Sequence, residues 1–433
     1  MSKLSERFED VLLVVAEKVE DNKYLSSVKN AFTIFMPFII IGSFATLFNA
    51  LLCSPTTGLA KWIPALEKIK PAFTAINFST MSFMTIPIIF LIAMQLAKHN
   101  KAPEYITGVV AVAAYISVIP EVVTVVIDKT SGTAVGIPGV ALGAQGLFIG
   151  MILAILVTQL FSKLTKIDAI KIKMPASVPA GITTSFNSLI PIMITLIITA
   201  IAGNLFLNFT GMYVNDFIYK VVQAPLEVIF QSPIGIIAVV LISQLFWLLG
   251  IHGGLVISPI RNPLIAVAIA ANVAAVSSGG VATQAVTYGF WLNFVVAGGA
   301  GITLSLIFAI FIFSKREDYK MIAKLSFLPG LCGISEPLVF GLPLVLNPTF
   351  AIPFVLNSGI ATAIALFATK IGFMACNTVD TPFGVPVLIG PFIGHGLPGV
   401  VVQIIIFAVC TVTWAPFVLI SNKQAKKEVV KEV

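Results

Sequence analysis

Residues 325–348 read Leu-Ser-Phe-Leu-Pro-Gly-Leu-Cys-Gly-Ile-Ser-Glu-Pro-Leu-Val-Phe-Gly-Leu-Pro-Leu-Val-Leu-Asn-Pro, an apolar segment that four prolines and three glycines interrupt. It also contains one acidic residue, Glu336. Irregular backbone at membrane depth is tolerated only where protein covers it or where it lines a cavity. An ionisable group at that depth usually faces a cavity or a pathway. The stretch therefore predicts a re-entrant hairpin beside a polar site in a membrane protein; an extended interfacial loop is the alternative.

Two more broken segments carry polar residues. His252 lies in Leu249-Gly250-Ile251-His252-Gly253-Gly254, between long apolar runs. Residues 378–398, from Thr-Val-Asp-Thr-Pro to His-Gly-Leu-Pro, combine an apolar composition with frequent helix breakers. They predict a second re-entrant hairpin, with an interfacial loop again as the alternative.

The composition is that of a membrane protein. Of the 433 residues, 58% are hydrophobic and 10% are charged, whereas soluble domains contain about 25% charged residues. Apolar runs recur at about 20 residues, the length that a helix needs to cross the hydrocarbon core. We predict an all-α polytopic membrane protein with about ten transmembrane helices, two re-entrant hairpins and interfacial amphipathic helices. The crossings are expected near residues 31–53, 78–98, 104–126, 144–164, 182–207, 234–250, 259–277, 288–314, 350–371 and 399–420.

Charge and periodicity orient these crossings. Lysine and arginine cluster after the second, fourth, eighth and tenth crossings, which makes that side cytoplasmic and places both termini inside. Helical spacing of apolar residues in Met1–Asn30 predicts an amphipathic helix on the membrane surface, or else a frayed tail. Residues 209–232 mix polar and apolar positions and predict a second surface helix.

We expect four parts along the chain. They are a cytoplasmic amphipathic segment at 1–30, an N-terminal transmembrane half at 31–207, a C-terminal transmembrane half at 208–422 and a cytoplasmic basic tail at 423–433. Lys171–Pro191, which is basic and then interrupted by prolines, is expected to link the halves. All candidate site residues fall in the second half.

Several functions are disfavoured. The net charge of +7 comes from basic loops and not from a basic stripe, so a nucleic-acid partner is not expected. The four cysteines are far apart and form no Cys-x-x-Cys pair, which speaks against a metal or disulfides. No Gly-x-x-x-x-Gly-Lys-Ser/Thr motif is present, so we expect no ATP hydrolysis on this chain, and we predict no cofactor.

The second half contains what a site for a neutral hydroxylated ligand requires, namely hydrogen-bonding groups and aromatic rings in an apolar cavity. Each candidate also has a structural alternative: His252 could satisfy backbone at a helix end, Glu336 could pair with a basic residue, and Trp247 could face lipid. Arg261 could position a phosphate or anchor the membrane edge. The candidate ligand-binding residues are Gln244, Trp247, His252, Gly253, Gly254, Asn293, Ser335, Glu336 and Asp380.

Two motifs, His252-Gly253-Gly254 and Gly333-Ile334-Ser335-Glu336-Pro337-Leu338-Val339-Phe340-Gly341, resemble those of a known family. It is the membrane component, enzyme IIC, of sugar phosphotransferase systems, in the group for lactose, cellobiose and diacetylchitobiose. Lys173-Met174-Pro175-x-Ser177-Val178-Pro179 and Asn347-Pro348 also match, and the resemblance covers nearly the full length in order.

The resemblance implies a homodimer of ten-helix subunits in the bacterial cell membrane. The first half would build the dimer interface, and the second would bind the sugar and move it inward. A separate cytoplasmic enzyme IIB, supplied by enzyme IIA, would then phosphorylate the sugar's primary hydroxyl from its phosphocysteine. The sugar-contacting His and Glu of the family correspond to His252 and Glu336. Ser335 replaces a frequent Asn, and Val379-Asp380-Thr381-Pro382 lacks a frequent Trp, which leaves the sugar open among β-linked disaccharides such as cellobiose and diacetylchitobiose.

These roles are chemically reasonable. Glu336 could accept a hydrogen bond from the reacting hydroxyl or remove its proton as a general base, and His252 could orient that hydroxyl. Since the phosphoryl group comes from outside, the chain would supply positioning, and whether it is itself an enzyme stays open. Two alternatives remain: an ion-coupled secondary sugar transporter in which Glu336 carries a proton, and an integral membrane transferase with Glu336 and His252 as catalysts.

Overall fold

The computed structural model describes residues 21–55, 58–127, 130–172, 175, 178–342 and 344–432. The chain forms two compact units, Glu20–Glu227 and Val228–Val433, which we call the N-unit and the C-unit. Their boundary lies later in the chain than the linker expected at Lys171–Pro191 and the division expected at 207/208. Each unit is described by itself below.

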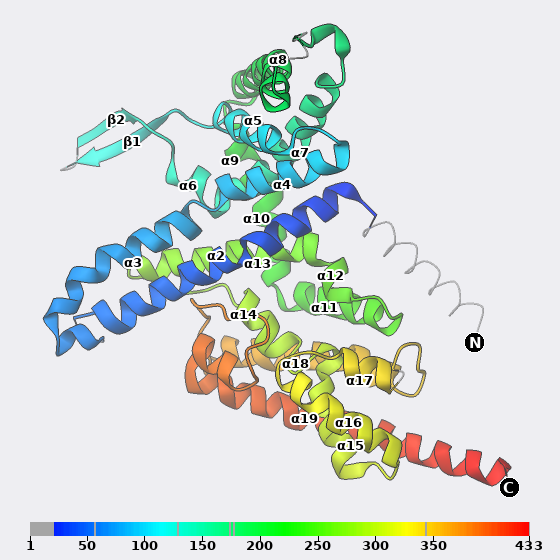
Figure 1. The fold of residues 1–433 in the computed structure, drawn as a ribbon. Helices are drawn as coiled ribbons and strands as arrows, with labels where there is room; N and C mark the ends of the chain where they lie inside the picture. The colour runs from blue at the N-terminus through cyan, green and yellow to red at the C-terminus, as the bar shows by residue number, and fades with distance from the viewer. Residues whose placement is uncertain are drawn as a thin grey trace. The chain divides into compact units, whose positions relative to one another are not determined.

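The N-unit is helical apart from one small β-hairpin (Figure 1). α4 packs against both α5 and α7. Small residues permit these contacts, because a Cβ at Gly150 would lie 2.9 Å from Ile89 and one at Gly108 would lie 2.5 Å from Phe90. The α-helices are α2 (Lys23–Cys53), α3 (Lys70–Asn77), α4 (Thr85–Asn100), α5 (Glu104–Ile116), α6 (Gly139–Leu142), α7 (Leu147–Leu164), α8 (Ala180–Thr210), α9 (Val214–Ile218) and α10 (Ala224–Gln231), whose residues 228–231 belong to the C-unit.

The crossing predicted at 104–126 is wrong in its second part. α5 ends at Ile116, and β1 (Val122–Ile127) pairs antiparallel with β2 (Thr130–Val135) so that Val122 lies opposite Val135. Pro120 disfavours helix at the residue before it, and the β-branched run that follows favours extended backbone. The run of apolar residues that predicted this crossing is divided between two elements, α5 and β1.

The ends of the chain also differ from expectation. α2 begins at Lys23, where Asn22 caps it by accepting from the backbone N–H groups of Tyr24 and Leu25. Residues 23–30 therefore belong to the first long helix, and residues 1–20 of the surface helix expected at 1–30 lie outside the described residues. α19 continues to Glu432, so the basic tail expected at 423–433 is helical up to that residue.

The C-unit surrounds several broken segments. α15 packs against α16 and α19, and α11 packs against α18; the first group is visible in the yellow to red part of Figure 1. The helices are α11 (Pro233–Leu248), α12 (Gly253–Val256), α13 (Ser258–Ser277), α14 (Tyr288–Phe290), α15 (Thr303–Phe313), α16 (Glu317–Leu331), α17 (Glu336–Gly341), α18 (Ala351–Lys370) and α19 (Ile389–Glu432).

The two segments predicted as re-entrant hairpins both interrupt the helical pattern. Residues 325–348 comprise the end of α16, a turn at Cys332–Gly333 and the short helix α17, which packs back against α16. Residues 378–388 contain no helix, and α19 is then kinked at Gly396, where φ is 67°. Neither segment is a continuous crossing, as the helix breakers predict.

The crossing predicted at 288–314 is also interrupted. α14 passes into a π-helical turn at Trp291–Val295, and the backbone then takes positive φ at Gly298, Gly299, Gly301 and Ile302 before α15 begins. A Cβ at Gly299 would lie 2.7 Å from the Cβ of Ser335. This break therefore makes room for the loop that precedes α17.

The membrane class is confirmed. Among the described residues, seven helices are long and apolar enough to cross a membrane, or up to nine if each of two bent helix pairs counts as one span. α5, which corresponds to the remaining predicted crossing, has 13 residues, fewer than the roughly 20 that a straight span needs.

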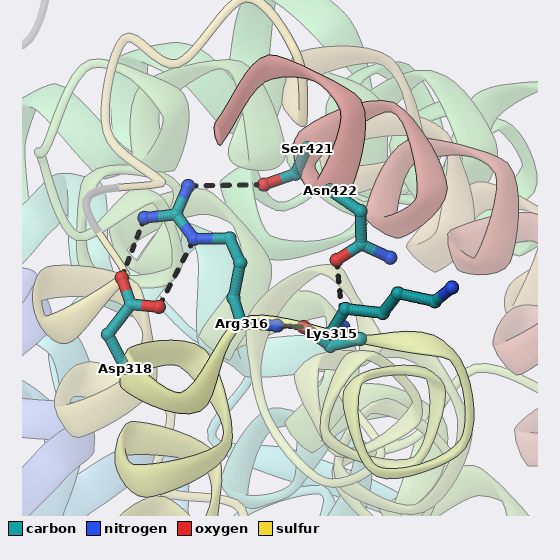
Figure 2. Close-up of polar contacts among 6 residues, drawn as sticks. Lys315, Arg316, Asp318, Ser421 and Asn422 are labelled. Atoms are coloured by element: carbon teal, nitrogen blue, oxygen red, sulfur yellow. Dashed lines mark hydrogen bonds and ion pairs between the residues drawn. The ribbon is translucent and has the colours of Figure 1, made fainter. Parts of the chain in front are cut away.

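A polar network ties the loop before α16 to α19 (Figure 2). Arg316 donates to both carboxylate oxygens of Asp318 at 3.2 and 2.6 Å and to Ser421 at 3.5 Å. The backbone N–H of Lys315 donates to Asn422 at 2.9 Å. The hydrogen bond from Arg316 lowers the pKa of Asp318, so the pair is intact at neutral pH and weakens only as the pH falls below the usual range of an aspartate.

Candidate functional site

A cavity of about 260 Å³ lies within the C-unit. Its walls come from the end of α11, the start of α13, the region around α14 and the turn before α17, so segments far apart in the sequence meet there. Most of the lining is aromatic or apolar, with a few polar groups, which is the usual makeup of a small-molecule site. The lining residues are Ser243, Trp247, His252, Gly254, Leu255, Arg261, Tyr288, Trp291, Leu292, Val296, Ala300, Gly333, Ser335, Glu336 and Phe383.

His252 is held in a defined orientation. The chain turns after α11 at Gly250, where φ is 82°, and His252 then caps α12 by accepting the backbone N–H of Leu255 on Nδ1 at 3.2 Å. Its ring lies against that of Trp247, with 4.3 Å between the centroids and 45° between the ring planes. Because Nδ1 is an acceptor, the neutral imidazole carries its proton on Nε2. His252 therefore both caps a helix and lines the cavity.

Glu336 faces the same cavity. It is the first residue of α17 and is partly exposed. No hydrogen bond or ion pair joins its carboxylate to any other described residue, so the structural alternative of a basic partner receives no support. The carboxylate lies close enough to His252 to interact electrostatically with the imidazole. A general base or hydrogen-bond acceptor and a histidine thus share one cavity.

The two glycines after His252 have different functions. A Cβ at Gly253 would overlap with the backbone carbonyl of Ser243 in α11, so this glycine allows α12 to pack against α11. Gly254 lines the cavity, and a Cβ there would lie 3.2 Å from Cε1 of His252. Both glycines were candidate ligand-binding residues, but only Gly254 lies in the cavity wall.

Four predicted residues do not line this cavity. Gly253 packs on α11. Gln244 is fully buried, and neither its amide nitrogen nor its amide oxygen has a hydrogen-bond partner among the described residues. Asp380 is also buried. Asn293 lines a smaller neighbouring cavity of about 30 Å³, which shares Leu292 with the main one. The main cavity is lined by the other five predicted residues, Trp247, His252, Gly254, Ser335 and Glu336.

The lining also contains residues that the sequence analysis did not select. Tyr288 and Trp291 come from α14 and the π-helical turn, and Phe383 comes from the second broken segment. The guanidinium of Arg261 lies over the Trp291 ring, 4.7 Å from its centroid. Tyr288 and Trp291 could have been found from the sequence, because they belong to an aromatic cluster at residues 288–291 that comes just before the candidate Asn293.

Asp380 organises the wall that carries these aromatic residues. Its Oδ1 accepts the backbone N–H of Gly289 at 2.6 Å and the side-chain N–H of Asn377 at 2.9 Å. Asn377 in turn accepts from Thr287, the cap of α14, at 2.6 Å. A Cβ at Gly289 would lie 2.9 Å from Oδ1 of Asp380. Asp380 thus holds the start of α14 and positions Tyr288 and Trp291.

We expect Asp380→Ala to weaken ligand binding without removing any lining residue. The backbone N–H of Gly289 would lose its buried acceptor, at a cost of about 1–3 kcal/mol, and α14 would shift. Asp380→Asn keeps an acceptor oxygen and should retain more of the affinity. Binding and thermal unfolding of both variants are the measurements. Equal affinity in Asp380→Ala and the unaltered protein would contradict this positioning function.

Comparison with known proteins identifies the class. Residues 29–358 match the family described as phosphotransferase system, EIIC. This chain therefore belongs to the membrane-spanning sugar permease components of the phosphotransferase system.

Individual relatives agree with that membership. The oligo-beta-mannoside-specific EIIC component of Bacillus subtilis (strain 168) is 29% identical and is aligned over 99% of this chain and 97% of its own. The cellobiose-specific EIIC component of Geobacillus stearothermophilus is 28% identical, over 99% and 96%. The crystal structure of the transporter ChbC, the IIC component from the N,N'-diacetylchitobiose-specific phosphotransferase system, superposes with a TM-score of 0.90 at 28% identity, covering 97% of this chain and 98% of that chain.

Proposed function

We propose that this permease component binds a β-linked disaccharide in the C-unit cavity and carries it inward. It then presents the sugar's primary hydroxyl to enzyme IIB. The observation that carries the proposal is the shared cavity of Glu336 and His252, walled by aromatic rings. The named sugars of three relatives, oligo-beta-mannoside, cellobiose and diacetylchitobiose, support the substrate class.

The geometry suits a hydroxyl acceptor. Glu336 would accept the hydroxyl proton, and the Nε2–H of His252 would donate a hydrogen bond that orients the sugar. Trp247, Tyr288 and Trp291 would contact apolar faces of the sugar rings. The phosphoryl donor would be the phosphocysteine of enzyme IIB, so the chain supplies positioning and a proton acceptor.

The proposed assembly is a homodimer in the bacterial cell membrane, with both termini cytoplasmic and enzyme IIA upstream of enzyme IIB. The lactose-specific EIICB component of Staphylococcus aureus (strain COL) supports an enzyme IIB partner, because this chain aligns with 71% of that longer protein at 27% identity. In our proposal the N-unit forms the dimer scaffold.

Uptake into vesicles that contain the purified protein tests the proposal. With radiolabelled cellobiose, diacetylchitobiose and β-1,4-mannobiose, we expect accumulation of a sugar phosphate that requires phosphoenolpyruvate and enzymes IIA and IIB. Unmodified sugar driven by a pH gradient would instead show an ion-coupled transporter. Consumption of a lipid-linked or nucleotide-sugar donor would show a membrane transferase.

In our proposal, enzyme IIB docks on the basic segment 315–324, which comprises the residues just before α16 and the first half of that helix. Lys315 and Lys324 have exposed side chains, and none of the ion pairs among the described residues involves them. We expect Lys315→Glu with Lys324→Glu to raise the enzyme IIB concentration needed for half-maximal transfer by about tenfold and to leave sugar affinity unchanged, since exposed charges act mainly on encounter. Titration with enzyme IIB measures this, and an unchanged requirement would rule out the surface.

Arg316 belongs to the same basic segment, but its guanidinium is bound to Asp318 and Ser421 (Figure 2). Reversing its charge would disturb the connection between the loop and α19. A variant of Arg316 would therefore change both the docking of enzyme IIB and the local fold, so the docking test leaves Arg316 unaltered.

A further inference from the structure

Arg261 is a cation in the wall of the cavity that a neutral sugar does not require. Its side chain lies on the first turn of α13 and is buried, with 9% of the residue exposed. Nε and Nη2 donate to a neutral acceptor, Oδ1 of Asn262, at 3.2 and 2.9 Å. None of the ion pairs among the described residues includes Arg261. A buried cation without a counter-ion is costly, so an anionic partner at this place would stabilise the wall.

The remaining nitrogen, Nη1, points to where such an anion would bind. A Cβ added at Gly254 would lie 3.6 Å from Nη1 and 3.2 Å from Cε1 of His252. The guanidinium and the imidazole therefore flank the same point on the cavity wall, and Glu336 faces that cavity. The guanidinium lies over the face of Trp291, and this cation–π contact helps to hold it in place.

We propose that Arg261 binds the non-bridging oxygens of the phosphoryl group while it is transferred to the sugar, and holds the same group in the sugar phosphate product. This inference rests on the proposed function. The sugar hydroxyl oxygen attacks the phosphorus of the enzyme IIB phosphocysteine. The new O–P bond forms as the S–P bond breaks, sulfur leaves as a thiolate, and the hydroxyl proton passes to Glu336. Arg261 forms no covalent bond; its fork of N–H groups matches phosphoryl oxygens and stabilises their charge.

Two ligands and two variants test the assignment. Cellobiose and cellobiose 6'-phosphate are titrated into the purified protein, into Arg261→Gln and into Arg261→Lys, and single-turnover transfer is followed with phosphorylated enzyme IIB. Lys370→Gln, which removes an exposed lysine at the end of α18 in the same unit, is the control for loss of one positive charge. If cellobiose proves to be a poor substrate, diacetylchitobiose and its 6'-phosphate replace the pair.

We expect Arg261→Gln to bind the neutral disaccharide within about twofold of the unaltered protein, to lose about tenfold or more in affinity for the sugar phosphate, and to slow transfer by about 10²-fold. Arg261→Lys should recover part of both losses, since it keeps the charge but not the fork. Thermal unfolding in detergent shows whether each variant is folded.

Equal losses for sugar and sugar phosphate would overturn the inference, because they would show that Arg261 only supports Trp291. The inference is also overturned if Arg261→Gln is unfolded and Arg261→Lys, though folded, binds both ligands as the unaltered protein does. Either result leaves the proposed function standing as long as the unaltered protein still phosphorylates the sugar. If the unaltered protein neither binds nor phosphorylates a β-linked disaccharide, the proposed function fails and the inference fails with it.

Discussion

Glu336→Gln is expected to abolish phosphorylation while leaving the fold intact. The amide has the same shape as the carboxylate but cannot take the proton of the reacting hydroxyl. Losing a general base costs about 10²–10⁴-fold in rate. The fold should survive because the carboxylate has no hydrogen-bond or ion-pair partner among the described residues. Replacing a charged acceptor by a neutral one should also weaken sugar binding, by about tenfold.

The measurement is sugar phosphate formation in vesicles, with sugar binding followed separately on the purified protein. Asp216→Asn removes an exposed acid from α9 in the N-unit and should transport normally, which controls for the loss of one negative charge. Near-normal sugar phosphate formation by Glu336→Gln would show that the carboxylate is no more than one of several sugar contacts.

Gly253→Ala is expected to destroy the site by a different route, through the backbone. The added Cβ would overlap with the carbonyl oxygen of Ser243 in α11. Neither partner is the end of a flexible side chain, so α11 and α12 would have to separate. Overpacking of this kind costs about 1–3 kcal/mol or more. Because His252 caps α12 and Trp247 lies on α11, the contact between their rings, 4.3 Å between centroids, would lose its geometry.

Gly254→Ala is the matched variant for folding. Its added Cβ would meet nothing closer than Cε1 of His252 at 3.2 Å, so we expect a thermal unfolding midpoint close to that of the unaltered protein. Its methyl group enters the cavity, and its sugar affinity is therefore not used as a control. Midpoints that fall equally in both variants, or that do not fall in either, would disprove the proposed contact between α11 and α12.

Choosing polar residues that lie in apolar sequence identified some, but not all, of the residues that line the cavity. The signal found His252 and Glu336, which line the cavity, and it also selected Asp380 and Gln244, which do not. A buried polar residue in a membrane protein serves either a ligand or the backbone, and both uses look alike in a sequence. Asp380 serves the backbone N–H of Gly289, a partner 91 residues away that no local pattern indicates.

Trp291 and Phe383 were missed, and Arg261 was left between two roles, for a related reason. An aromatic or basic residue near the end of an apolar run is as typical of the membrane edge as of a binding site. Positive φ occurs in the turns next to two of these side chains, at Gly250 before α12 and α13 and at Gly384 beside Phe383. The glycines were visible in the sequence, but the direction of each turn was not.

Hydropathy and helix breakers are local properties, so the printed sequence was enough to establish a polytopic helical membrane protein, the interruption of its helices near residues 333 and 380, and the motif that carries Glu336. The prediction of the third crossing was wrong because hydropathy does not distinguish a transmembrane helix from a short helix followed by an apolar hairpin. Here the short helix is α5 and the hairpin is β1–β2. Which polar side chains share one cavity, and which glycine serves packing and not the ligand, depended on contacts between segments distant in the chain. Such contacts follow from how the C-unit packs as a whole, and no window of sequence contains them.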